Sequence, residues 1–232
     1  MINKKQLSLL VLFGAMLMNS AKAQLNIGVD AGITYNQLQF KSNNPDLKLS
    51  KRTGYLVNIN VSKQLSKWIT IEATPGIIQK NYTVQNKHNI YQDINNTYLH
   101  LPLDIKYEIS LLKPLKLSAA LGMYYAYWLE SNISGIAPNV FNIANNAEGD
   151  ELIQLENIKS NYKFNATQDN RSEFGWLAKV GLSYRILKNV SCSLKGHYYQ
   201  SISDQQKQSN EFQSPKYNQT FATTIGLAYD LK

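Results

Sequence analysis

A regular alternation of apolar and polar residues recurs along the chain, and it limits the chain to a fold built from β-strands. The segment Tyr98–Glu108 is typical: apolar or aromatic residues fill its odd positions, while His100, Asp104 and Lys106 lie between them. Side chains on a strand point alternately to two opposite faces, so this segment has one apolar and one ionic face. The pattern predicts strands; it does not by itself say which face meets water.

The same alternation predicts eight strands joined by polar loops and turns. It is broken wherever Asn, Ser, Pro and charged residues cluster, as at Asn43–Asp46. We therefore predict an all-β, eight-stranded antiparallel up-and-down barrel whose strands cover approximately residues 25–40, 53–62, 68–84, 98–108, 115–128, 174–186, 190–199 and 220–231.

Between the fifth and sixth predicted strands lies a long segment without alternation, Ser131–Arg171, which is rich in Asn, Ser and acidic residues. Structureless segments of this length are uncommon inside compact domains unless they are functional or mobile. We expect an external loop here, and the sequence also admits a short helix within Glu148–Ile158.

The N-terminal residues have the features of a secretory signal peptide. Lys4 and Lys5 precede an apolar run over residues 7–18, and Ala21-Lys22-Ala23 forms a small-x-small cleavage site. A membrane anchor is the weaker alternative because the apolar run is short. We predict a signal peptide at residues 1–23 and a barrel domain at residues 24–232 of an exported protein.

Charge and cysteine content exclude several classes of protein. Loss of residues 1–23 removes three of the 24 basic residues and no acidic residue, which leaves 21 basic against 16 acidic side chains. This excess is scattered, so nucleic-acid binding is not expected. Cys192 is the only cysteine, which rules out an internal disulfide and a Cys-based metal or redox site. No cofactor is expected.

Three features predict that the apolar face meets lipid. First, short connections alternate with long ones, as in outer-membrane barrels. Second, aromatic residues on the apolar face fall at two levels, with Tyr107, Tyr184 and Tyr229 near the short turns and a second group near the long loops. Third, this face carries no charged residue in the strand centres. A soluble lipocalin-like barrel, with its apolar face inside, is the alternative.

Three segments resemble the PorT-like outer-membrane β-barrel family. They are Tyr98–Tyr107 (YLHLPLDIKY), Ala120–Tyr127 (ALGMYYAY) and Gly175–Tyr184 (GWLAKVGLSY). The resemblance implies a transmembrane barrel in the outer membrane of a Gram-negative cell. One member of that family is tied to a protein-secretion system, but the resemblance implies no mechanism.

The polar face then points into a lumen that eight strands leave only wide enough for side chains. We expect opposite charges to pair there and fill it, because an unpaired buried charge is costly. A gated ion path or a small-ligand site is the alternative. The predicted interior polar network is Asp30, Glu72, His100, Asp104, Lys106, Lys179, Arg185, Lys195, His197 and Asp230.

Two further patterns lie on these strands. His100 and Asp104, with His197, could serve a hydrolase or bind a metal, but no activated serine or third ligand accompanies them. We interpret them as hydrogen-bonded interior residues and predict neither a catalytic nor a metal site. Pro75 and Pro102 each lack a ladder donor, which predicts a bulge or irregular pairing in adjacent strands.

The sequence leaves three classes of function open. The first is a non-enzymatic outer-membrane protein that serves surface binding, adhesion, or a secretion or envelope assembly. Its partners would be outer-membrane lipid and another envelope or surface protein, contacted through residues 131–171, and a monomer is favoured. The second is an outer-membrane lipid-modifying or proteolytic enzyme, and the third is the soluble ligand-binding barrel.

Overall fold

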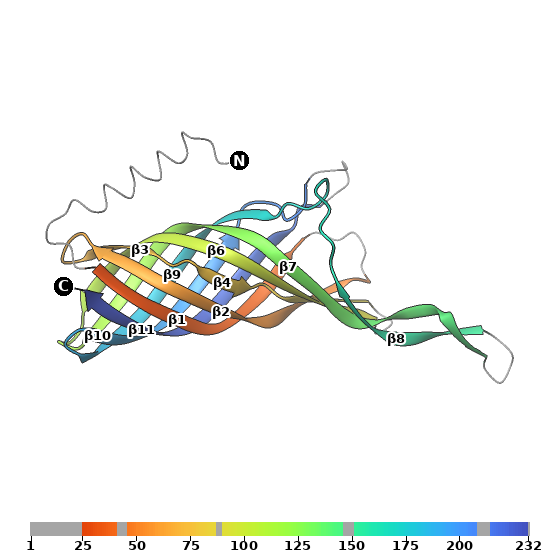
Figure 1. Cartoon of the computed structure of the whole chain (residues 1–232), viewed down its shortest axis with the longest axis horizontal. Helices are drawn as coiled ribbons and strands as arrows, with labels where there is room; N and C mark the ends of the chain where they lie inside the picture. The colour runs from red at the N-terminus through yellow and green to blue at the C-terminus, as the bar shows by residue number, and fades with distance from the viewer. Residues whose placement is uncertain (1–24, 41–45, 87–89, 146–150, 208–213, 232) are drawn as a thin grey trace.

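The computed structural model describes residues 25–40, 46–86, 90–145, 151–207 and 214–231 (Figure 1). The predicted signal peptide, residues 1–23, lies outside them. No helix within the described residues is long and apolar enough to cross a membrane. The strands are β1 (Leu25–Gln39), β2 (Lys48–Gln64), β3 (Ile69–Ala73), β4 (Gly76–Gln79), β5 (Tyr82–Gln85), β6 (Tyr91–Ser110), β7 (Leu115–Asn145), β8 (Glu151–Asn161), β9 (Ser172–Leu187), β10 (Val190–Ser201) and β11 (Tyr217–Leu231).

Antiparallel neighbours close these strands into a ring of eight wall strands, with β3, β4 and β5 together forming one of them. The ring closes where β1 pairs with β11 over its whole length, from Leu25 opposite Leu231 to Gln39 opposite Tyr217. Closure gives every wall strand two neighbours, which is what a sheet surrounded by lipid requires. The predicted eight-stranded antiparallel barrel is confirmed.

The third wall strand is irregular, as its proline suggests. The ladder is interrupted at Thr74–Pro75, yet the pairings of Ala73 with Leu103 and of Gly76 with His100 keep one register. Pairing of β6 with β7 runs through Pro102 without a shift. Pro75 and Pro102 therefore each remove a hydrogen-bond donor from the ladder without inserting an extra residue into their strands. The bulge of β6 and β7 lies elsewhere, between Thr97 and Tyr98.

The segment predicted as a loop is largely a β-hairpin, and the expectation of a helix within it is wrong. β7 continues to Asn145, and β8 pairs back onto it from Asn161 opposite Asn132 to Glu151 opposite Asn145. We call this hairpin, residues 131–161, the arm. It projects beyond the barrel, at the end away from the C-terminus (Figure 1). The structure of the arm is decided by pairing between β7 and β8, which the local sequence does not indicate.

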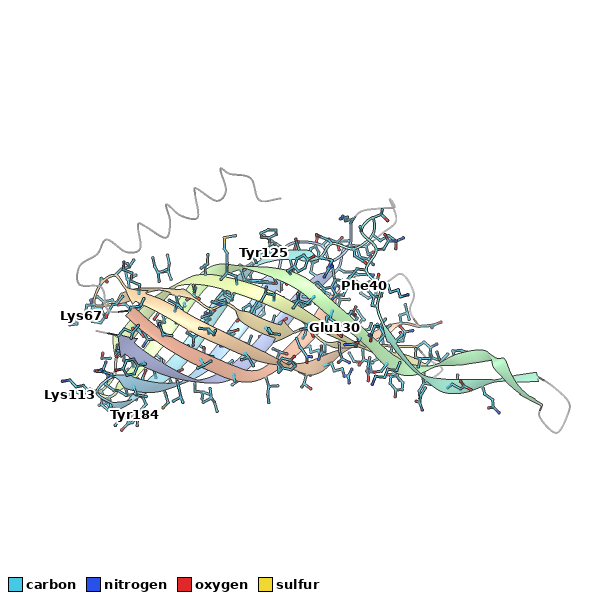
Figure 2. The ribbon with its side chains drawn as sticks, in the orientation of Figure 1. Phe40, Lys67, Lys113, Tyr125, Glu130 and Tyr184 are labelled. Carbon is cyan, nitrogen blue, oxygen red and sulfur yellow. The ribbon has the colours of Figure 1, made fainter. Side chains whose placement is uncertain are left out.

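The outward face is apolar and uncovered. Leu99, Leu103 and Ile105 are 51%, 48% and 61% exposed, although they belong to the apolar face of their strand. The predicted aromatics near the short turns, Tyr107 and Tyr184, are also exposed. Figure 2 places Tyr184 beside Lys113 at one end of the barrel, with Phe40 and Glu130 toward the arm. An exposed apolar band of this kind is the surface that lipid covers.

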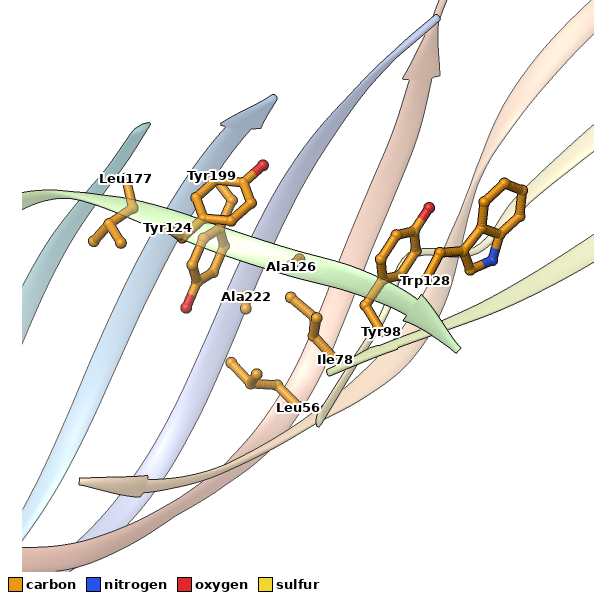
Figure 3. Close-up of a cluster of buried hydrophobic side chains, with 9 residues drawn as sticks. All are labelled: Leu56, Ile78, Tyr98, Tyr124, Ala126, Trp128, Leu177, Tyr199 and Ala222. Atoms are coloured by element: carbon orange, nitrogen blue, oxygen red, sulfur yellow. The ribbon is translucent and has the colours of Figure 1, made fainter. Parts of the chain in front are cut away.

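The inward face is only partly polar. Besides charged side chains it carries a cluster of buried apolar and aromatic side chains inside the barrel (Figure 3): Leu56, Ile78, Tyr98, Tyr124, Ala126, Trp128, Leu177, Tyr199 and Ala222. Leu56, Ile78 and Leu177 are each 0% exposed. Buried apolar side chains therefore share the task of filling the lumen with the charges.

Candidate functional site

The charged groups in the middle of the lumen converge on Lys179 of β9. Its Nζ lies 3.1 Å from Glu72 Oε1 and 2.5 Å from Asp104 Oδ2, and it donates to Thr74 Oγ1 at 3.3 Å. The three charged side chains are at most 5% exposed. Glu72 and Asp104 are opposite each other on the neighbouring strands β3 and β6, and Lys179 links them to β9, which is separated from β6 by β7.

Two further lysines extend this network toward the short-turn end. Lys195 Nζ lies 2.8 Å from Asp30 Oδ2, which joins β10 to β1. Lys106 Nζ lies 3.4 Å from the second oxygen of Glu72 and 3.3 Å from Glu108. Each of these cations therefore has a carboxylate within ion-pair distance.

Arg185 and Asp230 occupy the rim of a polar cavity at the short-turn end. Their ion pair is long, 3.9 Å, and Asp230 also accepts a hydrogen bond of 2.8 Å from Asn26 Nδ2. The cavity has a volume of about 100 Å³ and includes Glu72 and Lys106 in its lining. This space suits a few water molecules and ends at the Lys179 cluster.

The two inward histidines do not form the acid–base pair that the sequence could suggest. His100 Nε2 lies 2.7 Å from the side-chain oxygen of Asn58, while Asp104 is bound to Lys179. His197 Nε2 lies 2.9 Å from Thr224 Oγ1. Both imidazoles are buried, 2% and 4% exposed, and each is hydrogen-bonded to a side chain of the barrel wall.

An ion pair in the outer half of the lumen is not predicted by the sequence pattern. Lys80 and Glu173 are in contact, and Glu173 also accepts hydrogen bonds from Tyr124 (2.7 Å) and Asn218 (2.7 Å). Lys80 stands at the break between β4 and β5. Glu173 comes one residue before the predicted start of its strand. The alternation over residues 68–84 does place Lys80 on the polar face, but Glu173 lies outside its predicted strand, so the pair itself cannot be derived from the local pattern.

The outer opening of the lumen is covered by stacked aromatic rings at the base of the arm. Trp128 stacks on Tyr98 at 5.8 Å and on Tyr162 at 6.1 Å, while Phe164 meets it edge-on at 4.9 Å. The Arg171 guanidinium lies 4.2 Å from the Phe164 ring centre. Arg171 also donates to the carbonyl of Trp128 at 2.9 Å, beside the bulge in β7.

Two chain segments complete this cover, residues 162–171 and residues 202–207. The Asn170 N–H donates to the Gln205 carbonyl at 3.0 Å, and the Lys207 N–H donates to the Gln168 carbonyl at 2.8 Å. Gln205 also reaches inward and donates to Tyr98 Oη at 2.9 Å. At this outer surface, partial burial and the hydrogen bond donated to Asp169 raise the pKa of Tyr162. The lumen is thus filled by charges and apolar side chains and covered at its outer end.

The arm contrasts with this filled interior. β9 pairs with β7 only as far as Ser172, which is opposite Tyr127. From residue 132 of β7 onward, β8 is the neighbour on that side. β8 pairs with β7 over eleven residues, from Asn161 to Glu151, which span about 35 Å at the usual rise of a strand, and β7 shifts register between Asn139 and Ile143. The side chains of residues 154–157 and 159–161 of β8 are exposed. This ribbon is the largest described element that leaves the barrel wall.

Comparison with known proteins identifies the family. Residues 18–206 match the model of the outer membrane protein beta-barrel domain. The chain belongs to this family. As a member of it, the protein lies in the outer membrane with its lipid-facing band in the bilayer. Outer-membrane barrels have short periplasmic turns and long external loops, which predicts that the arm faces the outside. No curated protein sequence matches the chain.

Solved structures of outer-membrane proteins share the fold. OprG from Pseudomonas aeruginosa is 10% identical, with a TM-score of 0.53 over 93% of this chain and 98% of that one. The protease OmpT from Escherichia coli is 12% identical, with a TM-score of 0.50 over 92% and 99%. AlkL, solved in DMPC lipid bilayers, is 12% identical, with a TM-score of 0.50 over 92% and 94%. At these identities the likeness shows the fold alone.

Proposed function

We propose that this outer-membrane barrel is a non-enzymatic surface-binding protein in which the barrel is an anchor and the arm makes the contacts. The observation that carries the proposal is the arm itself, a ribbon of about 35 Å that stands outside a covered lumen. Binding through an element that projects from a rigid scaffold is a common arrangement, because exposed segments are free to meet partners.

The interior supports the same proposal from the opposite side. An ion path needs a continuous polar passage, whereas this lumen contains Leu56, Ile78 and Leu177 at 0% exposure between the charged cluster and the outer cover. An enzyme of the outer membrane needs an acid–base set that a substrate can reach. His100 and His197 instead lie buried with Asn58 and Thr224 as their partners.

The resemblance to the PorT-like family adds a second form of the same proposal. A partner in a secretion or envelope assembly would also have to be contacted outside the bilayer, and the arm is the described surface with the largest reach. The proposal favours direct binding at the cell surface, because the arm points away from the periplasm.

A shortened arm tests the proposal without disturbing the barrel. Ala137 and Glu156 stand opposite each other in the ribbon, so residues 138–155 can be replaced by an Asn-Gly turn, a pair that favours tight hairpins. Cells that carry the wild-type or the shortened protein would be compared for attachment to coated surfaces and to cells without the protein. We expect a several-fold loss of attachment on shortening. Equal attachment of both proteins to every surface, with equal amounts in the membrane, would contradict the proposal.

A further inference from the structure

The two long edges of the arm differ in their capacity to add another strand. β8 pairs with β7 alone among the described residues, so its other edge carries unpaired backbone groups. Such an edge is a template for strand addition unless proline, a bulge or a covering element blocks it. A two-stranded ribbon is also only marginally stable in water, so a third strand would stabilise it.

The hydrogen-bond pattern shows which groups face outward from β8. The N–H of Tyr162 donates to the carbonyl of Ser131 at 2.9 Å, which marks residue 162 as bonded toward β7. In an antiparallel ladder this role alternates along the strand. Residues 160, 158, 156 and 154 therefore bond toward β7, while Leu155, Asn157, Lys159 and Asn161 direct N–H and C=O away from it.

The free edge of β7 is blocked where β6 ends. β6 follows β7 only as far as Tyr91 opposite Ile136, and Pro138 comes two residues later. Pro138 stands opposite Leu155, where the main-chain nitrogen of β7 points away from β8. The proline removes the donor that this edge would offer, as it does in natural edge strands. β8 contains no proline, so only one edge of the arm is left able to pair.

We propose that the edge of β8 pairs antiparallel with the same edge of a second copy of this protein in a facing membrane. The inference rests on the proposed surface-binding role of the arm and names its partner. The alignment sets Leu155 opposite Leu155 of the second copy and Gln154 opposite Glu156. Leu155 is 49% exposed, so its apolar surface would be buried, and an amide donor would face a carboxylate.

Charge decides between this arrangement and a dimer within one membrane. Two copies related by an axis along the membrane normal would place their β8 strands parallel and in register. Glu156 would then lie beside Glu156 and Lys159 beside Lys159, which is unfavourable. The antiparallel alignment avoids both contacts. It also places the two barrels at opposite ends of the joined four-stranded sheet, and therefore in two membranes.

Vesicle bridging tests the proposal. Purified full-length protein would be reconstituted in two populations of phosphatidylcholine vesicles with different dyes, and two-colour coincidence would report bridging. Asn157→Pro removes one outward N–H from β8, whereas the matched Asn157→Ala keeps it. We expect several-fold more coincidence for the wild type and Asn157→Ala than for Asn157→Pro, and none when one population lacks protein. Wild-type vesicles that do not bridge, or that bridge equally well with protein-free vesicles or with Asn157→Pro, would overturn the proposal.

Cross-linking tests the register independently of any folding effect of proline. In a Cys192→Ser background, Leu155→Cys places thiols opposite each other, and a short thiol-specific reagent should join the two copies. Ser160 is five residues from Leu155, so two Ser160→Cys thiols would lie ten residues apart, about 33 Å, and should not be joined. Cross-linking at both positions would indicate the parallel arrangement and overturn the proposal. Arm-dependent attachment to protein-free surfaces without vesicle bridging would leave the surface-binding function standing and refute only the self-pairing.

Discussion

The lumen and the arm share strand β7, but their polar groups lie in opposite environments. In the lumen, β9 supplies Lys179 to carboxylates from β3 and β6, and the charged groups are almost fully buried. In the arm, β7 continues past the start of β9 and, beyond Ile136, where its pairing with β6 ends, pairs with β8 alone. The side chains of residues 154–157 and 159–161 of β8 are exposed. This difference indicates that the closed ring provides the stability of the protein, whereas the ribbon provides a surface that partners can reach.

Removal of the central cation should damage the barrel most. Lys179→Met leaves Glu72 and Asp104 buried beside each other, and breaking a buried ion pair costs about 3–5 kcal/mol. Urea unfolding in lipid vesicles, followed by tryptophan fluorescence, would measure the free energy of unfolding. The control is Lys116→Met at the rim, where the lysine is 33% exposed and 3.7 Å from Glu108, with an expected loss of less than about 1 kcal/mol. Equal losses for the two variants would show that the buried charges of the lumen do not stabilise the barrel.

A smaller and more local effect is expected where the lumen meets the outer cover. Tyr98→Phe removes the hydroxyl that accepts hydrogen bonds from Gln205 at 2.9 Å and Asn218 at 3.5 Å. The net cost of a lost hydrogen bond is about 1 kcal/mol. A loosened cover would show as faster hydrogen exchange of residues 202–207 in the variant than in the wild type, with exchange in the barrel strands unchanged. Tyr107→Phe, at the lipid-facing surface, is the matched control, and an equal response to it would argue against this contact.

The arm should contribute least to the barrel's stability. With residues 138–155 replaced by the Asn-Gly turn, β7 still pairs with β6 and β9 within the wall. The free energy of unfolding of the barrel should change by no more than about 0.5 kcal/mol, as for most surface changes. Heat-modifiable mobility on a gel and urea unfolding would measure this. A shortened protein that fails to form the barrel would show that the two regions are not separable.

Much of the barrel can be predicted because a strand that faces lipid and lumen carries its environment in every second residue. The segment Leu99–Tyr107 is an example, with exposed Leu99 and Leu103 and buried His100 and Asp104. Grouping of the interior charges also follows from strand direction, which places Lys179 and Glu72 at similar depth. Their partners cannot be assigned from the sequence, because the choice among carboxylates depends on register across the ring.

The arm cannot be predicted from local sequence, because its structure depends on pairing between distant residues. Both faces of the ribbon meet water, so β8 needs no alternation to bury one of them. Tyr91 and the residues after it also lack a strand pattern, although they form the start of β6 and pair with the extended β7. Lys80 falls on the predicted polar face of residues 68–84, whereas its partner Glu173 lies one residue before its predicted strand and is missed. Sequence patterns therefore predict which faces are buried well, but they predict poorly how strands pair when both of their faces are exposed.

Electrical recording across a planar lipid bilayer tests most directly whether the barrel is an anchor and not a channel. Purified wild-type protein, shown to be folded by heat-modifiable mobility, would be inserted at low density and held under an applied voltage. The filled and covered lumen predicts no steady conductance above the bare bilayer. Steady conductance steps in the nanosiemens range would contradict the anchor role, because they require a continuous aqueous path past Lys179 and Trp128.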